Sequence, residues 1–210
     1  MYYDRIEAGL TLAKALGKYR KEPGLVLAVP RGGIPVAYYV ASELGFPLDL
    51  LLTKKIGHPL NSEYAIGAVS LTDSYVVQHE GVSQSYIDAE TLRIRKKLKD
   101  MYEKFRGNKE PEPISGKTVI IVDDGIATGN TLMSTINMLK KGNPEKIVIA
   151  VPVASRNAID KLSGMVDEIV CPLVPDNFHG VGGYYKNFDQ VSDEEVMMYL
   201  NKFNEFGRAV

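Results

Sequence analysis

The stretch from Thr118 to Thr131 constrains the fold of this chain more than any other part of it. Its first half, Val119 to Val122, is a run of β-branched apolar residues, which predicts a strand buried on both faces of a sheet. Two adjacent carboxylates, Asp123 and Asp124, follow that strand directly. Small residues come next, and then an amphipathic segment from Leu132 to Lys141, which together predict a tight loop leading into a helix.

The loop after the two carboxylates is predicted to bind a phosphate. It consists of Gly125, Ile126, Ala127, Thr128, Gly129, Asn130 and Thr131. The glycines let the chain curl tightly, so that several backbone N–H groups point inward at the start of a helix. Asp123 and Asp124 would repel the phosphate, so they suit a neutral polyol, a cation or both. A sugar phosphate whose ring hydroxyls face the two carboxylates satisfies all of these groups.

A second anion site is predicted after the strand Leu25 to Val29. There the sequence Pro30-Arg31-Gly32-Gly33 places one cation and two residues without side chains at a strand's carboxyl end, where open α/β sheets bind ligands. Backbone N–H groups freed by Gly32 and Gly33, together with the Arg31 guanidinium, form the expected anion nest. The two loops suit a ligand that carries two anionic groups.

A pair of lysines, Lys54 and Lys55, closes the next predicted strand, Leu48 to Thr53, at the same edge of the sheet. In one interpretation, one of these lysines contacts a pyrophosphate. In the other, both are simply solvated.

Strands and helices alternate along the chain, which is typical of a parallel central sheet flanked by helices. We therefore expect an α/β fold with a single domain over residues 1–210. The first helix is expected to bury one face, and a β-hairpin is expected near the middle of the chain. The residues behind these expectations are Ile6, Leu10, Ala13 and Leu16 for the helix face, Ala65–Ser70 and Tyr75–Gln78 for the hairpin, Val36–Leu44, Asn157–Leu162 and a segment from about Asp193 for further helices, and Ile147–Val151 and Glu168–Cys171 for further strands.

The segment from Ser83 to Phe105 predicts a long helix, because apolar residues recur along it at spacings of four and three. Ser83 or Ser85 is expected to cap its start. Between Arg93 and Arg106 lie seven Lys or Arg residues and only two acids. This is either a solvated basic face or part of a mobile arm whose cations meet a pyrophosphate or a neighbouring subunit.

The pattern from Thr118 to Thr131 resembles the ribose-phosphate loop of the type I phosphoribosyltransferases. The resemblance implies that Asp123 and Asp124 hold the ribose hydroxyls of 5-phosphoribosyl-1-pyrophosphate and that residues 126–131 cradle its 5′-phosphate. The loop at residues 30–33 then corresponds to the family's pyrophosphate loop, which often contains a non-proline cis peptide, here Pro30–Arg31. The implied reaction transfers the phosphoribosyl group to a nucleobase-like acceptor and releases pyrophosphate. Mg²⁺ is expected to be carried by the substrate, with no direct protein ligand.

The same resemblance implies a flexible hairpin and helix insertion at about residues 70–116 and a small C-terminal hood at about residues 172–192. Phe178 in the hood is expected to stack on the acceptor base, and the protein is expected to form a homodimer. In the 6-oxopurine branch of the family a third Asp faces the base, but Ala127 stands at that position here. That branch also has a lysine in the next strand, and Ile147–Val151 has none. The implied acceptor is therefore not a 6-oxopurine.

Composition narrows the class of partner. The net charge is −1 and the pI about 6.3, which argues against a general nucleic-acid binder. No apolar run reaches membrane-spanning length, and the first ten residues carry charges where a signal peptide needs an apolar core. We expect a cytoplasmic protein with no membrane partner. Cys171 is the single cysteine, so no intramolecular disulfide is expected.

Two other functions use the same pockets. The chain could be a non-catalytic regulatory protein that senses phosphoribosyl pyrophosphate, with the Arg93 to Arg106 cluster contacting a nucleic acid. It could also be a nucleoside-phosphate hydrolase or another sugar-phosphate enzyme. Release of pyrophosphate on adding a base separates an enzyme from a sensor, and the products separate a transferase from a hydrolase.

Overall fold

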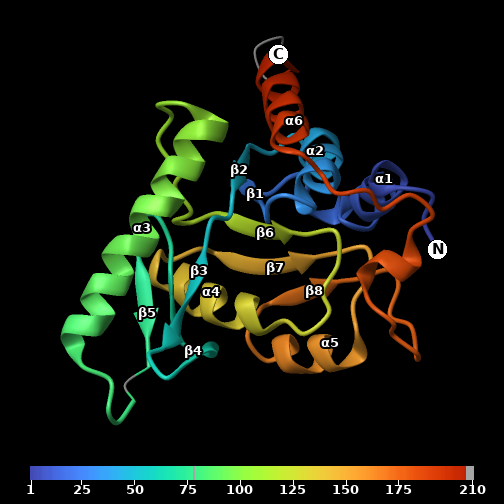
Figure 1. The fold of residues 1–210 in the computed structure, drawn as a ribbon. Helices are drawn as coiled ribbons and strands as arrows, with labels where there is room; N and C mark the ends of the chain where they lie inside the picture. The colour runs from blue at the N-terminus through green and yellow to red at the C-terminus, as the bar shows by residue number, and fades with distance from the viewer. Residues whose placement is uncertain (78, 207–210) are drawn as a thin grey trace.

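The computed structural model describes residues 1–77 and 79–206, which contain a five-stranded parallel sheet (Figure 1). Its strands are β1 (Gly24–Ala28), β2 (Leu48–Leu50), β6 (Thr118–Val122), β7 (Lys146–Ala150) and β8 (Glu168–Val170). They lie in the order β2-β1-β6-β7-β8, and every neighbouring pair is parallel. The predicted α/β fold with a parallel central sheet is confirmed.

Helices cover both faces of the sheet, because alternate side chains of each strand point to opposite sides. On one face Val26 and Ala28 pack with α2 (Gly33–Leu44) and α6 (Asp193–Phe206). On the other face Leu25 and Leu27 pack with two helices, α4 (Asn130–Lys141) and α5 (Arg156–Ser163). Figure 1 shows the first pair of helices above the sheet and the second pair below it.

The first helix, α1 (Arg5–Ala15), buries only part of the face that was predicted. Ala13 and Leu16 are buried as predicted, together with Leu12, but Ile6 and Leu10 remain 38% and 39% exposed. The reason is a close approach of α1 to α2, since a Cβ on Gly9 would lie 3.0 Å from the carbonyl oxygen of Val36. Small residues therefore decide which side of α1 is buried, and a pattern of large apolar residues does not show this.

A separate antiparallel sheet lies beside the main one, in the order β3-β4-β5. Its strands are β3 (Lys54–His58), β4 (Asn61–Val69) and β5 (Ser74–Val76). The predicted hairpin corresponds to the β4–β5 pair, and Gln78, which we expected in its second strand, lies outside the described residues.

Lys54 and Lys55 were expected to end a strand, but they begin β3, so that prediction is wrong. The preceding strand, β2, stops at Leu50 because its partner β1 ends at Ala28, the residue that pairs with Leu50. The apolar run continues to Leu52 without a turn residue, so the sequence does not mark the point where the chain leaves the sheet.

The long basic segment forms α3 (Gln84–Arg106), with the predicted cap, since the Ser83 side chain accepts a hydrogen bond from the Tyr86 backbone N–H. Its apolar stripe enters the main core, where Ile94 and Leu98 are buried. This places α3 in the packed part of the insertion. The mobility of residues 70–116 stays a prediction.

The segment between β8 and α6 pairs with the N-terminal residues of the chain. Tyr2 forms a parallel bridge with Tyr185, and its backbone N–H donates to the carbonyl of Tyr184 (2.8 Å). A short 3-10 helix, Val181–Tyr184, lies in this segment. In the described part of the chain, no helix has the length and apolar character needed to cross a membrane.

Candidate active site

The two predicted anion loops lie side by side because the strands that precede them are neighbours. β1 pairs with β6 in register from Gly24 opposite Thr118 to Ala28 opposite Val122, so both loops leave the same edge of the sheet. The chain moves outward in opposite directions from these two strands, to β2 on one side and to β7 on the other. Such a switch point is where open α/β sheets bind ligands.

The two helices that start in these loops differ from the others at their N-termini. Side chains cap α1, α3 and α5, through Asp4, Ser83 and Ser155, and Ser192 accepts from the Glu195 N–H at the start of α6. No side chain caps α2 at Gly32 or α4 at Gly129. In α2 the N–H groups of Gly33 and Ile34 donate to the carbonyls of Val29 and Arg31, at 3.0 and 3.1 Å. Among the described residues, the N–H groups of Asn130 and Thr131 at the start of α4 have no such acceptor, so they are available to an anion, which helix N-termini favour.

Glycine is required where the first loop meets the carboxylates. A Cβ on Gly32 would lie 2.0 Å from Oδ2 of Asp124, and one on Gly33 would lie 2.7 Å from the carbonyl oxygen of Val122. The backbone of residues 30–33 therefore packs directly against the acid pair. The peptide bond between Pro30 and Arg31 is cis, as the resemblance implied.

The second loop is held by the segment that follows β7. Ile126 forms a parallel bridge with Ala154, and its N–H donates to Val153 (3.0 Å). The hydroxyl of Ser155 donates to the carbonyl of Ala127 (2.6 Å) while it also caps α5. Gly129 adopts a left-handed conformation (φ 72°) at the start of α4, which a residue with a side chain rarely adopts.

Arg5, on the first turn of α1, contacts the second of the two acids. Its Nε and a terminal nitrogen both lie 2.9 Å from Oδ2 of Asp124. The same guanidinium donates to the carbonyl of Asp189 (2.8 Å) and stacks 3.9 Å above the ring of Phe188. Arg5 thus joins α1, the acid pair and the segment before α6, and both ion-pair side chains are at most 14% exposed.

Burial makes the ionised form of this pair costly. It raises the pKa of Asp123 well above its usual range, and the neighbouring Asp124 carboxylate raises it further. Burial also raises the pKa of Asp124, and Arg5 partly offsets that rise. The Asp124 backbone N–H donates to Oδ1 of Asp123 (2.8 Å), and the Tyr185 hydroxyl donates to the Asp124 carbonyl (2.6 Å).

Arg5→Gln is expected to move the acidic limb of activity to higher pH. Arg5 lowers the pKa of Asp124, so without it the carboxyl takes up its proton at a higher pH and loses its charge there. A pH–rate profile measures the shift. The control Arg20→Gln removes an exposed pair with Glu43 and should leave the profile unchanged. Overlapping profiles for Arg5→Gln and the native protein would exclude this role.

Arg31, Lys54 and Lys55, the three predicted cationic site residues, lie in different positions relative to the two loops. The Arg31 guanidinium reaches Asp193 at the start of α6, with its Nε 2.5 Å from Oδ1. Lys55 lines a cavity of about 500 Å³ together with Thr128, Asn130 and Thr131 of the second loop. Lys54 precedes Lys55 in the strand and therefore points to the opposite face of its sheet. The structure thus brings Lys55 beside the predicted phosphate loop, and Lys54 does not line that cavity.

Phe178 lies in a small aromatic cluster in the hood. Its ring stacks on Tyr184 with centroids 5.7 Å apart, and it packs, like Val181, against the buried cluster that contains Tyr185. Val181 in turn approaches the second loop, since a Cβ on Gly125 would lie 2.5 Å from its Cγ1. The hood is therefore adjacent to the acid pair, and the contact of Phe178 with an acceptor stays a prediction.

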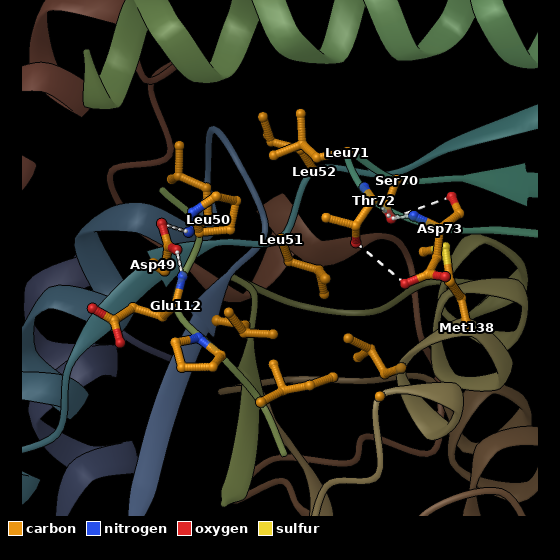
Figure 2. A pocket seen from close by; sticks show the side chains of 16 residues that line it. Asp49, Leu50, Leu51, Leu52, Ser70, Leu71, Thr72, Asp73, Glu112 and Met138 are labelled. Atoms are coloured by element: carbon orange, nitrogen blue, oxygen red, sulfur yellow. Dashed lines mark hydrogen bonds between the residues drawn. The ribbon is translucent and has the colours of Figure 1, made fainter. Parts of the chain in front are cut away.

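A different cavity, of about 270 Å³, lies between the end of β2, the β4–β5 turn and the end of α4 (Figure 2). There Asp49 accepts hydrogen bonds from the backbone N–H groups of Leu50 and Glu112, both at 2.8 Å, and Arg106 lies 3.3 Å away. None of the predicted site residues lines this cavity. The candidate site is therefore at the junction of β1 and β6.

The sequence analysis did not identify several residues that hold the site. Arg5, Ser155, Tyr185 and Asp193 come from four separate parts of the chain. The residues at the start of α5 predict that Ser155 caps this helix, but they do not predict its hydrogen bond to the carbonyl of Ala127. Tyr64 and Ser134 also line the cavity beside Lys55.

Known proteins resemble this chain along nearly its whole length. Residues 4–189 match the family described as the phosphoribosyl transferase domain. A protein of Mycobacterium tuberculosis, provisionally named a phosphoribosyl transferase, is 36% identical over 207 residues, which cover 96% of this chain and 47% of that protein. A Thermus thermophilus protein of known crystal structure is 37% identical to this chain in sequence. The two structures superpose with a TM-score of 0.87, over 96% of this chain and 98% of that one.

Similarity extends more weakly to an amidophosphoribosyltransferase of Mycobacterium tuberculosis, 27% identical over 147 residues, which cover 70% of this chain and 22% of that enzyme. The chain spans about half the length of the first of these curated relatives. The family match includes both loops, the acid pair and most of the hood. The chain belongs to the phosphoribosyl transferase domain family.

Proposed function

We propose that this protein transfers the 5-phosphoribosyl group of 5-phosphoribosyl-1-pyrophosphate to a nucleobase-like acceptor and releases pyrophosphate. The observation that carries the proposal is the contact of two loops, each leading into a helix that no side chain caps, with one pair of carboxylates. Gly32 at the start of α2 packs against Asp124, and Asp124 precedes the loop that starts α4. Two anion sites with a hydroxyl-binding pair between them match a ribose that carries a phosphate at one end and a diphosphate at the other.

The proposed mechanism is nucleophilic substitution at ribose C1. The N-terminus of α4 holds the 5′-phosphate, and Asp123 and Asp124 accept hydrogen bonds from the ribose hydroxyls. Their negative charge favours the positive charge that develops at C1 as pyrophosphate departs. The first loop, with Arg31 and Gly32, receives the pyrophosphate. A loop that closes over the site would exclude water, which would otherwise compete with the acceptor for C1.

Magnesium is proposed to enter with the substrate. Among the described residues, no three His, Cys, Asp or Glu side chains gather to hold a metal ion. Carboxylate oxygens still suit this hard cation, so Asp123 and Asp124 would hold it through the ribose hydroxyls or water. When bound, magnesium lowers the negative charge of the departing pyrophosphate.

A panel of free bases with phosphoribosyl pyrophosphate and magnesium tests the activity. One base is expected to give pyrophosphate and a nucleotide in equal amounts, which a sensor would not form and a hydrolase would not need. Hypoxanthine and guanine are expected to be inactive, because Ala127 cannot accept a proton from a ring nitrogen and Ile147–Val151 has no side-chain donor. Efficient turnover of either base would overturn this specificity.

Phe178→Ala is expected to raise the Michaelis constant for the acceptor roughly tenfold, because stacking on a base contributes about 1–3 kcal/mol. Binding of phosphoribosyl pyrophosphate alone should hardly change, since that ligand is proposed to contact the other two loops. Steady-state kinetics with each substrate varied in turn make the comparison. Equal effects on both substrates would mean that Phe178 only supports the hood, where it stacks on Tyr184.

A further inference from the structure

Asp193, the first residue of α6, connects the first anion loop to the basic helix α3. Its Oδ1 accepts from Nε of Arg31 and its Oδ2 accepts from Nζ of Lys104, both at 2.5 Å. The Asp193 side chain is partly buried, at 20% exposed, whereas Arg31 and Lys104 are 43% and 51% exposed. One carboxylate thus holds two cations from segments about seventy residues apart in the sequence.

The contact to Arg31 uses Nε, at the side of the guanidinium. In the described part of the chain no acceptor contacts its two terminal nitrogens. A guanidinium is planar, so fixing Nε also fixes the direction of the two terminal N–H₂ groups. That free edge has the spacing for two parallel hydrogen bonds to one phosphate.

We propose that Asp193 is a positioning residue that orients Arg31 for the pyrophosphate group, while Lys104 neutralises Asp193 from the other side. The inference rests on the proposed function and assigns a role that lies outside both loops. With Lys104 present, the three side chains carry a net charge of +1, so the carboxylate does not cancel the attraction of the loop for an anion. In this arrangement the basic helix α3 contributes to the site through Lys104.

Charge alone predicts the opposite effect of removing Asp193. Asp193→Asn raises the local net charge from +1 to +2, which would tighten the binding of a polyanion. Loss of orientation would weaken it, because the Arg31 side chain regains its rotamers and must be ordered by the ligand. The sign of the change in pyrophosphate affinity therefore distinguishes positioning from simple electrostatics.

The start of α6 does not depend on Asp193. The Ser192 hydroxyl accepts from the Glu195 N–H (3.2 Å), and the Glu195 carboxylate accepts from the Ser192 N–H (2.9 Å), which together form a capping box. Val196 and Leu200 on the buried side of α6 are fully buried. Asp193→Asn should therefore leave the helix and its packing in place.

Calorimetric titration of the whole chain with magnesium pyrophosphate, and separately with ribose 5-phosphate, tests the inference. Asp193→Asn is expected to raise the dissociation constant for pyrophosphate roughly tenfold, as for loss of a well-oriented charged hydrogen bond. Ribose 5-phosphate, which belongs to the other loop, should bind with unchanged affinity. The matched control Glu194→Gln removes the same charge one residue later, where no ion pair is formed among the described residues, and should change neither affinity.

Two further variants keep the result unambiguous. Arg31→Gln combined with Asp193→Asn should bind pyrophosphate no more weakly than Arg31→Gln alone, since Asp193 acts through Arg31. Asp193→Glu, which keeps the charge, should recover part of the affinity and serves if the Asn variant does not fold. Unchanged or tighter pyrophosphate binding by folded Asp193→Asn overturns the positioning role. Failure of the native protein to bind pyrophosphate would instead overturn the proposed function, and this inference with it.

Discussion

Replacing both Asp123 and Asp124 with asparagine is expected to lower turnover by roughly a hundredfold or more, because the pair stabilises positive charge that develops only in the transition state. The fold should remain intact, since asparagine has nearly the same size and shape as aspartate and the residues of β6 that precede the pair stay buried. Steady-state rates and a thermal melt of the same preparation give both results. Near-native turnover by a folded double variant would refute the assigned role.

The single variant Asp123→Asn is also expected to make the protein more stable at neutral pH. The folded state raises the pKa of Asp123, so this group contributes stability fully below its unfolded pKa of about 4, and that stability is lost as the pH rises through the folded pKa. An asparagine does not titrate, and its amide oxygen can still accept the Asp124 N–H. The stability gain should therefore be absent at acidic pH and grow toward neutrality in urea unfolding.

Asp124→Asn serves as the comparison for that measurement. This change removes the carboxylate that pairs with Arg5. The Arg5 side chain is only 11% exposed, so its positive charge would be left unpaired in a buried position, which is destabilising. The gain in stability seen for Asp123→Asn should be smaller or reversed here. Equal gains for the two variants would show that the ion pair with Arg5 contributes nothing to the folded state.

Gly33→Ala is expected to destabilise the fold by about 1–3 kcal/mol, the usual cost of adding an atom to a packed site. The new Cβ would lie 2.7 Å from the carbonyl oxygen of Val122 and 2.9 Å from Cα of Asp123, and both are backbone atoms that cannot move aside. The loop and the acid pair would separate, so turnover should fall as well. Urea unfolding and initial rates on one sample test both effects.

Gly164→Ala is the matched control, because a Cβ there meets nothing within 4 Å. Its stability is expected to stay within about 0.5 kcal/mol of the native protein, as for ordinary surface substitutions. A Gly33→Ala protein as stable and active as the control would mean that the close contact between the loop and the acids is unnecessary.

Local patterns in the sequence were enough to predict the sheet and the two loops. Val119–Val122 and the preceding Thr118 form a strand whose bounds match the prediction, and the acids follow it directly. Such signals depend on neighbours in the sequence, as do the cap at Ser83 and the start of α6 at Asp193. The fold class and the position of the acid pair therefore follow from residues that are close together in the chain.

Contacts between distant segments could not be predicted in the same way. Arg5 lies 119 residues from Asp124, and Asp193 lies 162 residues from Arg31. The buried face of α1 depends on how closely Gly9 approaches α2, which no periodicity encodes. The antiparallel sheet that begins at Lys54 likewise depends on where β1 stops offering partners to β2.

Thermal unfolding with and without magnesium and phosphoribosyl pyrophosphate tests the central claim, that the two loops and the acid pair form one binding site for this ligand. Ligand at about a hundred times its dissociation constant should add about 2.7 kcal/mol to the free energy of unfolding. For a chain of this length the midpoint should rise by roughly 5–10 °C. The Asp123→Asn and Asp124→Asn double variant should show a smaller rise. A native midpoint that does not move at millimolar ligand would contradict the account.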